Sequence, residues 1–326
     1  MSTAAIFGLS GLTLTEAERD FFRSADPWGF ILFAHNVESP DQLRRLTGDL
    51  RDAVGRDAVI TVDQEGGRVQ RLRAPHWTDW DAPLNEGRRG PRAIWLRYRL
   101  IGAELRACGI DSNCAPTLDV AQADTHPFLR DRCLGDDASE VSMLGRAAAD
   151  GMLAAGVLPV VKHMPGHGRA RADSHKDLPV VDAPETALND SDFVPFRALK
   201  DAPLGMTAHI RYAALDDAPA TISAPMIELI RKRIGFQGLL MTDDLGMEAL
   251  PGNQVQRTAA AIAAGCDLAL ACHGDLPEKE AITAAAGQMS VAALARSARA
   301  LKLREDAQDD DIAALRAEYM GLRGMV

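Results

Sequence analysis

The sequence lacks the signals of a membrane or nucleic-acid protein. No apolar run approaches the roughly 18 residues that a membrane helix needs. The amino-terminal segment, MSTAAIFGLSGLTLTEAERD, has no basic cluster before an apolar stretch and does not resemble a signal peptide. The formal net charge of -10 gives no basic surface for nucleic acid or anionic lipid. We therefore expect neither a membrane nor a nucleic-acid partner.

The sequence also lacks a pattern of paired cysteines. Its five cysteines are odd in number and show no C-x-x-C spacing, which argues against a disulfide framework and against a zinc site. We interpret them as reduced thiols in the core. The expected compartment is reducing, and we predict the cytoplasm.

What the sequence does contain is a repeated alternation of short apolar runs and helical segments. The runs are Ala4–Leu9, Phe30–Ala34, Val59–Val62, Asp111–Ala115, Leu158–Val161, Gly205–Ala208, Leu239–Thr242 and Leu268–Cys272. Near-continuous apolar runs are typical of strands buried on both faces. Eight such strands alternating with helices predict an α/β fold, a (β/α)8 TIM barrel.

Helix-capping residues mark the segments between these runs. The predicted start and end signals are Ser39-Pro40 with Gly55, Pro91 with Gly109, Ser139-Glu140 with Gly156, and Ser223 with Gly235. No low-complexity linker divides the chain, so residues 1–326 are predicted to form a single domain. The helical tail, 290–326, is expected to pack on the barrel, with an acidic turn at 305–311 between two helices.

Polar residues recur at or just after the ends of the predicted strands. They are Asp63, Asp119, Lys162, His163, His209, Asp243, Asp244 and His273. In a TIM barrel the carboxyl ends of the strands form the face that carries the active site. The sequence therefore predicts that these side chains converge at one face.

Two segments concentrate the chemistry. The segment KHMPGHGRARADSHKDLPVV, 162–181, holds three histidines and Asp173; a carboxylate near His175 would orient its ring for general acid/base work. The segment GLLMTDDLGM, 238–247, places Asp243 directly after a buried strand, where it is the better nucleophile candidate. Asp244 is interpreted as structural, for example as a helix N-cap.

With VDQEGGRVQRL (62–72), these segments resemble the β-N-acetylglucosaminidases of glycoside hydrolase family three, of the single-domain NagZ type. The similarity extends to APTLDV, HPFLRDRCLG and MTAHI, in the family's order, from about residue 6 to 273. KHMPGHG followed by DSH is the most specific part. The tail after His273 carries no recognised motif.

The resemblance implies a retaining glycosidase without metal or cofactor. It implies Asp243 as nucleophile and His175 as acid/base, oriented by Asp173. It implies that the sugar is held by Asp63, Arg71, Arg132, Lys162 and His163. The implied substrate is a muropeptide of peptidoglycan recycling, GlcNAc-1,6-anhydro-MurNAc with or without peptide, and the implied assembly is a monomer or weak homodimer.

Two departures from the family pattern could alter the pocket wall: Cys133-Leu134 and His273, where the family commonly has other residues. Two alternatives also stay open. One is a metal-dependent barrel hydrolase with ligands among His163, His167, His175, His209 and Asp243. The other is a non-catalytic sugar-binding protein on the same scaffold.

Overall fold

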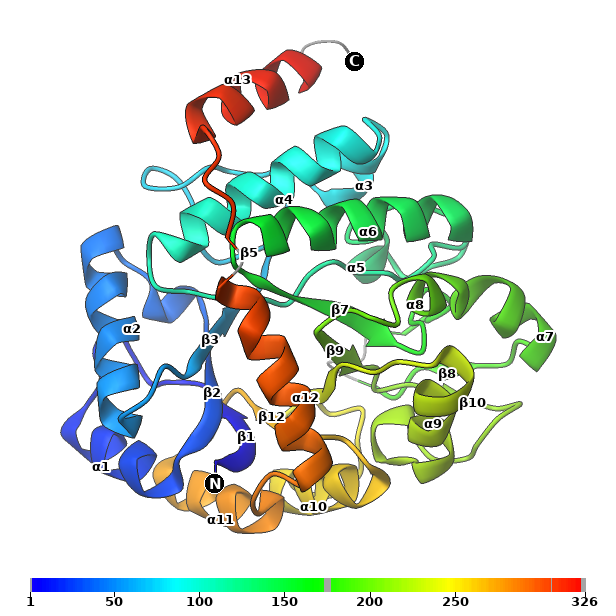
Figure 1. The fold of residues 1–326 in the computed structure, drawn as a ribbon. Coiled ribbons are helices and arrows are strands. Elements are labelled where there is room, and N and C mark those ends of the chain that lie inside the picture. Colours follow the sequence, from blue (N-terminus) through cyan, green and yellow to red (C-terminus); the bar gives the residue numbers. More distant parts are fainter. Residues whose placement is uncertain (1, 173–176, 306, 324–326) are drawn as a thin grey trace.

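Eight parallel strands close into a barrel in the computed structural model, which describes residues 2–172, 177–305 and 307–323 (Figure 1). In order around the barrel they are β1 Thr3–Phe7, β2 Pro27–Leu32, β3 Val59–Val62, β6 Ser112–Asn113, β7 Leu158–Met164, β9 Leu204–Thr207, β11 Leu239–Asp244 and β12 Leu268–Ala271. Each strand pairs in parallel with the next, and β12 returns to β1. The predicted (β/α)8 barrel is confirmed.

All eight predicted runs form barrel strands, although some of their ends differ. The strand β2 begins at Pro27, before the predicted Phe30, and β7 and β11 continue two or three residues past their predicted ends. The shortest barrel strand, β6, tolerates a buried asparagine because the Asn113 side chain bonds to the backbone of Gln64, which directly follows Asp63. The Asn113 side-chain amide donates to the carbonyl oxygen of Gln64 at 3.1 Å and accepts from the Gln64 N–H at 2.9 Å.

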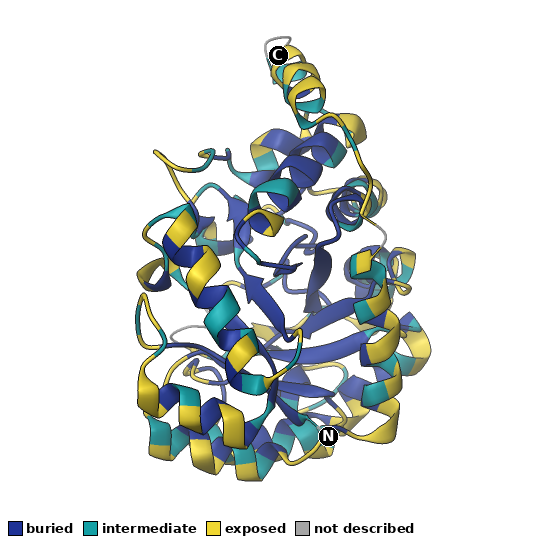
Figure 2. Cartoon of the chain, turned by 60° about the vertical axis from the view of Figure 1, so that its left-hand side comes forward, coloured by how far each residue is buried: buried dark blue, intermediate teal, exposed yellow. Residues whose placement is uncertain are grey.

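Helices surround the barrel, and the longer ones around it combine buried and exposed residues (Figure 2). They are α1 Glu16–Ala25, α2 Pro40–Val54, α3 Pro83–Gly87, α4 Pro91–Arg106, α5 Pro127–Arg130, α6 Ala138–Ala154, α7 Glu185–Ala187, α8 Val194–Ala198, α9 Ala224–Leu229, α10 Gln254–Ala264, α11 Leu276–Ala286, α12 Val291–Lys302 and α13 Ile312–Arg323. Short 3-10 or π turns are η1 Ala34–Asn36, η2 Leu188–Asp192, η3 Ala220–Ile222, η4 Ile230–Ile234 and η5 Leu303–Glu305. Among the described residues, no helix has the length and apolarity to cross a membrane.

The predicted caps Ser39 and Ser223 are confirmed, because each side-chain oxygen accepts a first-turn N–H. The predicted start of α6 at Ser139 is wrong. The N-cap lies two residues earlier, at Asp137, and the helix begins at Ala138. The Asp137 carboxylate accepts from the N–H groups of both Ser139 and Glu140 at 2.9 Å, which places an anion at the positive end of the helix.

Two small sheets reinforce the loops at the carboxyl ends of the strands. After β3, the strands β4 Gln64–Gly66 and β5 Val69–Gln70 form an antiparallel hairpin. The strands β8 Val180–Val181 and β10 Arg211–Tyr212 join the loops that follow β7 and β9. The carboxyl-terminal face of the barrel is therefore held by backbone pairing as well as by side chains.

The opposite face is closed by buried carboxylates at the starts of two strands. Asp267 precedes β12 and binds Arg231 at 2.6 Å and Arg296 of α12 at 2.8 Å. Asp111 precedes β6 and binds Arg51 at 3.2 Å and also Arg304, just after α12. The segment after 290 thus contacts the base of the barrel, and the acidic turn between two helices is found where the sequence predicted it.

The last helix, α13, packs on α4 at the outside of the barrel (Figure 1). Its Tyr319 is buried and donates to the carboxylate of Glu86 in α3 at 2.8 Å. The Tyr319 ring also packs against Trp80, with 5.5 Å between the ring centroids. The tail is therefore anchored by a buried polar contact as well as by apolar packing.

Candidate active site

Six of the eight polar residues predicted at the strand ends line one cavity of about 270 Å³ at the carboxyl-terminal face, whereas Asp119 and His209 are buried and do not belong to its described lining. Described residues that line it include Phe33, Asp63, Arg68, Arg71, Phe128, Arg132, Lys162, His163, His167, Met206, Asp243, Asp244, Met247 and His273. All five predicted sugar-binding residues and the predicted nucleophile belong to this set. The volume lies near the lower end of the range for small-molecule sites, about 300 Å³.

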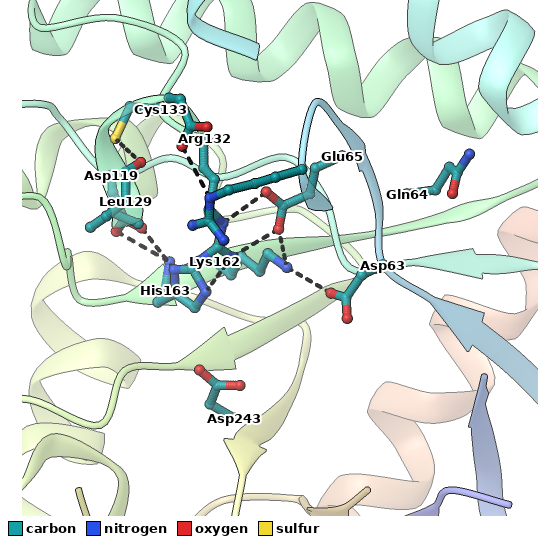
Figure 3. A network of polar contacts seen from close by, with 12 residues as sticks. Asp63, Gln64, Glu65, Asp119, Leu129, Arg132, Cys133, Lys162, His163 and Asp243 are labelled. Carbon is teal, nitrogen blue, oxygen red and sulfur yellow. Dashed lines mark hydrogen bonds and ion pairs between the residues drawn. The ribbon is translucent and has the colours of Figure 1, made fainter. Parts of the chain in front are cut away.

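One side of the cavity is a network of buried charges centred on Lys162 (Figure 3). The Lys162 ammonium lies 3.0 Å from a carboxylate oxygen of Asp63 and 2.6 Å from one of Glu65. Arg71 binds the other Asp63 oxygen at 2.8 Å. Arg132 donates to both Glu65 oxygens, at 2.8 and 2.9 Å. Three cations and two carboxylates therefore fix one another's positions.

Both carboxylates of this network stay ionised at neutral pH. Burial alone would raise the pKa of Asp63, but the charges of Lys162 and Arg71 outweigh it and hold that pKa well below its usual range. In the same way, burial is overcome at Glu65 by Arg132 and Lys162, which lower its pKa to about 2. The network therefore offers charged donors and acceptors, already oriented, to the hydroxyl groups of a ligand.

A second group of polar residues fixes His163. The Nδ1 atom of His163 lies 2.7 Å from a carboxylate oxygen of Asp119, which only accepts, so Nδ1 carries a proton. The Nε2 atom lies 3.4 Å from the Arg132 guanidinium. The other Asp119 oxygen accepts from the N–H of His167 at 2.6 Å. Asp119 thus sets the orientation of His163 toward the cavity.

Asp243 lies across the cavity from this network, at the end of β11 (Figure 3). One carboxylate oxygen accepts from the N–H of Asp244 at 2.8 Å. Burial would raise the Asp243 pKa, but the imidazoles of His163 and His209, the Asp244 N–H and Lys162 lower it below its ordinary value. The side chain is therefore an ionised carboxylate, as a nucleophile has to be.

Asp244 has a structural role, but it does not cap a helix. One carboxylate oxygen accepts from the N–H of Gly246 at 3.0 Å and from that of Cys272 at 3.2 Å. The carboxylate therefore ties the loop after β11 to the end of β12. The adjacent His209 is fully buried, and both its ring nitrogens have hydrogen-bonding partners.

The predicted acid/base pair, Asp173 and His175, lies outside the described residues. The chain shortly before this pair is held by two contacts. Arg169 binds the buried carboxylate of Asp192 at 2.8 Å, and the Thr125 hydroxyl donates to the carbonyl of Gly168 at 2.5 Å. A Cβ atom at Gly168 would lie 1.9 Å from a backbone oxygen, so this close approach requires glycine. The roles of Asp173 and His175 stay predictions.

Glu65 is the functional residue that the sequence analysis missed. It lies within VDQEGG, two residues after Asp63, but no strand run or histidine cluster distinguishes it. Asp119 was recognised only as a polar residue at a strand end. The alternation Asp63-x-Glu65, which places both carboxylates on one side of an extended segment, is the signal that could have found Glu65.

The two departures from the family pattern have different outcomes. His273 lines the cavity, and its ring lies 5.4 Å from that of Phe33. Cys133 and Leu134 do not themselves belong to the described cavity lining; both are buried in apolar clusters, and Cys133 packs with Leu129, which lines the cavity.

Two of the histidines named for a metal-dependent alternative, His163 and His209, are otherwise engaged. The Nδ1 atom of His163 is hydrogen-bonded to the Asp119 carboxylate, and both ring nitrogens of His209 have hydrogen-bonding partners. Within the described part of the chain, no group of three or more His, Cys, Asp or Glu side chains is arranged to hold a metal ion. Geometry therefore does not favour that alternative.

Comparison with known proteins identifies the family. Residues 14–305 match the family described as "Glycosyl hydrolase family 3 N terminal domain". The chain is 38% identical over 284 residues to a beta-hexosaminidase of Alkalilimnicola ehrlichii, covering 82% of this chain and 80% of that one. It is 36% identical over 283 residues to a beta-hexosaminidase of Bordetella pertussis, with 83% and 80% covered.

Among solved structures, NagZ from Neisseria gonorrhoeae in complex with N-trifluoroacetyl-D-glucosamine superposes with a TM-score of 0.86 at 27% identity, covering 98% of each chain. The barrel fold, the convergence of polar residues at the strand ends and the length of the sequence match all point to the same family. This chain belongs to glycoside hydrolase family 3.

Proposed function

We propose that this protein is a retaining β-N-acetylhexosaminidase that removes terminal β-linked GlcNAc. The observation that carries the proposal is the placement of an ionised carboxylate, Asp243, across a sugar-sized cavity from a fixed charge network. The beta-hexosaminidase relatives and the sugar-derivative complex of the structural neighbour support the same reaction and ring.

The charge network is proposed to bind the sugar ring. Asp63 is the acceptor for ring hydroxyls, while Arg71, Arg132 and Lys162 are donors. His163, oriented by Asp119, completes this set. Because these groups hold one another in place before a ligand arrives, their side chains lose little conformational freedom on binding.

In the proposed reaction Asp243 attacks the anomeric carbon and forms a covalent glycosyl-enzyme, while the leaving oxygen is protonated by His175. The same imidazole then takes a proton from a water molecule, whose oxygen attacks the anomeric carbon. The bond between the sugar and Asp243 breaks, which releases the sugar and regenerates the carboxylate. A histidine with an ordinary pKa near ~6.5 can serve both steps at neutral pH. Asp173 would orient the ring. No metal or cofactor enters this scheme.

The proposed substrate is an imported muropeptide, GlcNAc-1,6-anhydro-MurNAc with or without its peptide, and the proposed location is the cytoplasm. The family resemblance supports the substrate, and the cysteine usage supports the compartment. We further propose that the whole chain acts as one domain, as a monomer or weak homodimer. Cell fractionation that found the protein mainly outside the cytoplasm would contradict the recycling role.

A covalent trap tests the proposal most directly. A 5-fluoro-GlcNAc fluoride keeps the acetamido group, slows both steps through its ring fluorine, and still leaves readily at the anomeric centre. We expect stoichiometric labelling, with the label located by peptide mass spectrometry on Asp243. Turnover should favour p-nitrophenyl β-GlcNAc over the β-glucoside and the β-GalNAc analogue.

The same experiment separates the sugar-binding alternative. A non-catalytic protein would bind the fluoride reversibly, without a mass increase and without turnover. A label on any other carboxylate would overturn the assignment of the nucleophile but not of the glycosidase.

A further inference from the structure

His209 is a fully buried histidine next to the nucleophile that the proposed mechanism does not use. It lies two residues beyond β9, which pairs with β11 so that Leu204 faces Leu239 and Met206 faces Met241. The same register, continued past β9, places residue 209 beside residue 244 at the end of β11. The fold therefore directs this ring to the carbonyl of Asp244, the residue that follows Asp243.

The hydrogen bonds of His209 define its protonation. Its Nε2 atom lies 2.9 Å from the carbonyl oxygen of Asp244, which only accepts, so Nε2 carries a proton. Burial lowers the His209 pKa, so the ring is neutral at neutral pH. Its Nδ1 atom lies 2.8 Å from the Thr221 hydroxyl, which also lies 3.0 Å from the carbonyl oxygen of Ala208, so the one hydroxyl proton serves one of these two acceptors at a time. With both nitrogens engaged, and with no part in the described cavity lining, His209 is not placed to exchange protons with a substrate.

The backbone of Asp244 is held at both ends. Its N–H donates to the Asp243 carboxylate at 2.8 Å. Its carbonyl oxygen accepts from His209 and, at 3.1 Å, from the N–H of Met247. A rotation of this residue would swing its N–H away from the carboxylate that it orients. The direction of the Asp243 carboxylate therefore depends on what fixes the Asp244 carbonyl.

We propose that His209 is a positioning residue for the nucleophile: by binding the Asp244 carbonyl in its Nε2–H form, it aims the Asp243 carboxylate at the anomeric carbon. The inference rests on the proposed nucleophilic role of Asp243. Thr221 is the second part of the device, because its hydroxyl contacts the other ring nitrogen of His209. A misplacement of about 1 Å can cost on the order of 100-fold in rate.

The test uses kinetics that a general loss of structure does not reproduce. His209→Leu removes both hydrogen bonds. His209→Gln retains an N–H donor for the carbonyl. Thr221→Val keeps the bond from His209 to the Asp244 carbonyl but removes the hydroxyl beside Nδ1, together with its contacts to Thr207 and Ala208. For each variant that retains the wild-type circular dichroism spectrum, we would measure the inactivation rate constant and Ki of 5-fluoro-GlcNAc fluoride. We would also measure kcat/KM for aryl β-GlcNAc substrates with leaving groups of graded pKa.

We expect His209→Leu to lower the inactivation rate constant about 100-fold with Ki changed less than about threefold. The loss in kcat/KM should be equal for good and poor leaving groups, and azide should not restore turnover. The inactivation rate constant of His209→Gln should be at least tenfold higher than that of His209→Leu. Thr221→Val should lower this rate constant less than His209→Leu does, again with little change in Ki. If the leucine variant does not fold, these two variants carry the same measurement.

Three results would overturn the inference. An unchanged inactivation rate would mean that the Asp243 carboxylate needs no support from His209. A loss confined to poor leaving groups, with rescue by azide, would make His209 the acid/base. Parallel losses in rate and Ki would indicate a general structural role. Failure of the wild-type enzyme to label at Asp243 would instead reject the proposed function, and this outcome is visible before any His209 variant is made.

Discussion

At the scale of single residues, two neighbouring aspartates at the end of one strand have different surroundings. Asp243 faces the cavity, whereas the Asp244 carboxylate accepts two backbone N–H groups that join neighbouring loops. The position of Asp243 nearest the strand was enough to choose it from the sequence. The hydrogen bonds of Asp244 were not predictable, because Cys272 is far away along the chain.

This contrast gives the first prediction. Asp243→Asn should lower kcat by about three decades or more, because the amide is a poor nucleophile, while fold and sugar binding persist. Asp244→Asn should have a much milder effect, because the amide oxygen can still accept from Gly246 and Cys272. Steady-state kinetics and a binding titration check both variants. An Asp243→Asn enzyme with more than about a tenth of wild-type turnover would exclude Asp243 as nucleophile.

The second prediction concerns pH and His167, whose side chain is buried beside Asp119. Burial lowers its pKa from 6.5 to about 4, so the unfolded chain binds a proton between these pH values that the folded protein does not bind. Stability should therefore fall as pH drops from about 6.5 to about 4, by at most about 1.4 kcal/mol per pH unit for this group. His167→Gln should flatten this part of the profile.

Urea unfolding at several pH values measures the effect as a difference between wild type and variant. The pKa of His209 is lowered too and acts in the same window, but it is present in both proteins. Parallel stability profiles for the two proteins would show that His167 does not titrate as proposed.

At the scale of elements, the eight strands and the main helices were predictable because burial on both faces and capping residues are local signals. The hairpin of β4 and β5 was not, although it carries Glu65 and leads to Arg71. Its shape depends on contacts distant in sequence: the buried guanidinium of Arg97, in α4, donates to the carbonyl oxygens of Glu65 and Asp81, both at 2.6 Å. Such pairings leave no periodic trace in the sequence.

The third prediction tests this hairpin at Gly66. Gly66 has a φ of +105°, and a Cβ atom there would lie 1.9 Å from an Arg97 nitrogen and 2.4 Å from the Asp81 oxygen. Gly66→Ala should therefore displace the hairpin and lower kcat/KM for p-nitrophenyl β-GlcNAc by about tenfold or more. Melting temperature should fall as well, because the strain is paid in the folded state only.

The matched control is Gly48→Ala. Gly48 lies in the middle of α2, and a Cβ atom there would meet nothing within 4 Å. This variant should be fully active and slightly stabilised, by about 0.5–1 kcal/mol, because alanine favours the helix. If the two variants behaved alike in kinetics, the hairpin would not be the element that positions the sugar-binding residues.

At the scale of the whole molecule, the barrel class followed from the count and alternation of apolar runs. That the tail packs on the barrel was expected too, but the surface that receives it could not be predicted. Residues after 290 carry only a helical pattern, whereas their partners lie on early elements. Tyr319 of α13 reaches Glu86, and Arg316 reaches Glu104 at 3.0 Å. Propensity predicts that such helices form, but it does not identify the surface that receives them.

The fourth prediction measures this docking. Tyr319→Phe removes the hydroxyl that donates to a buried carboxylate oxygen of Glu86 and should lower the free energy of unfolding by about 1–3 kcal/mol. Met320→Ala is the control; Met320 is 57% exposed, and the change should stay within about 0.5 kcal/mol. Urea denaturation of the wild type and both variants measures these differences in the free energy of unfolding. Equal stabilities would mean that this contact contributes nothing measurable to stability.

The carboxylates at the base of the barrel have a consequence for the order in which the protein is made. Asp111 and Asp267 immediately precede strands β6 and β12, but Arg304 and Arg296, which complete their pairing, follow all eight strands along the chain. Because translation delivers the amino-terminal part first, the growing polypeptide holds every strand before it holds these partners. The barrel can reach its fully paired state only after residue 304 has been made, and a message truncated after β12 would encode all the strands of a barrel whose two basal carboxylates keep one arginine partner each, Arg51 and Arg231.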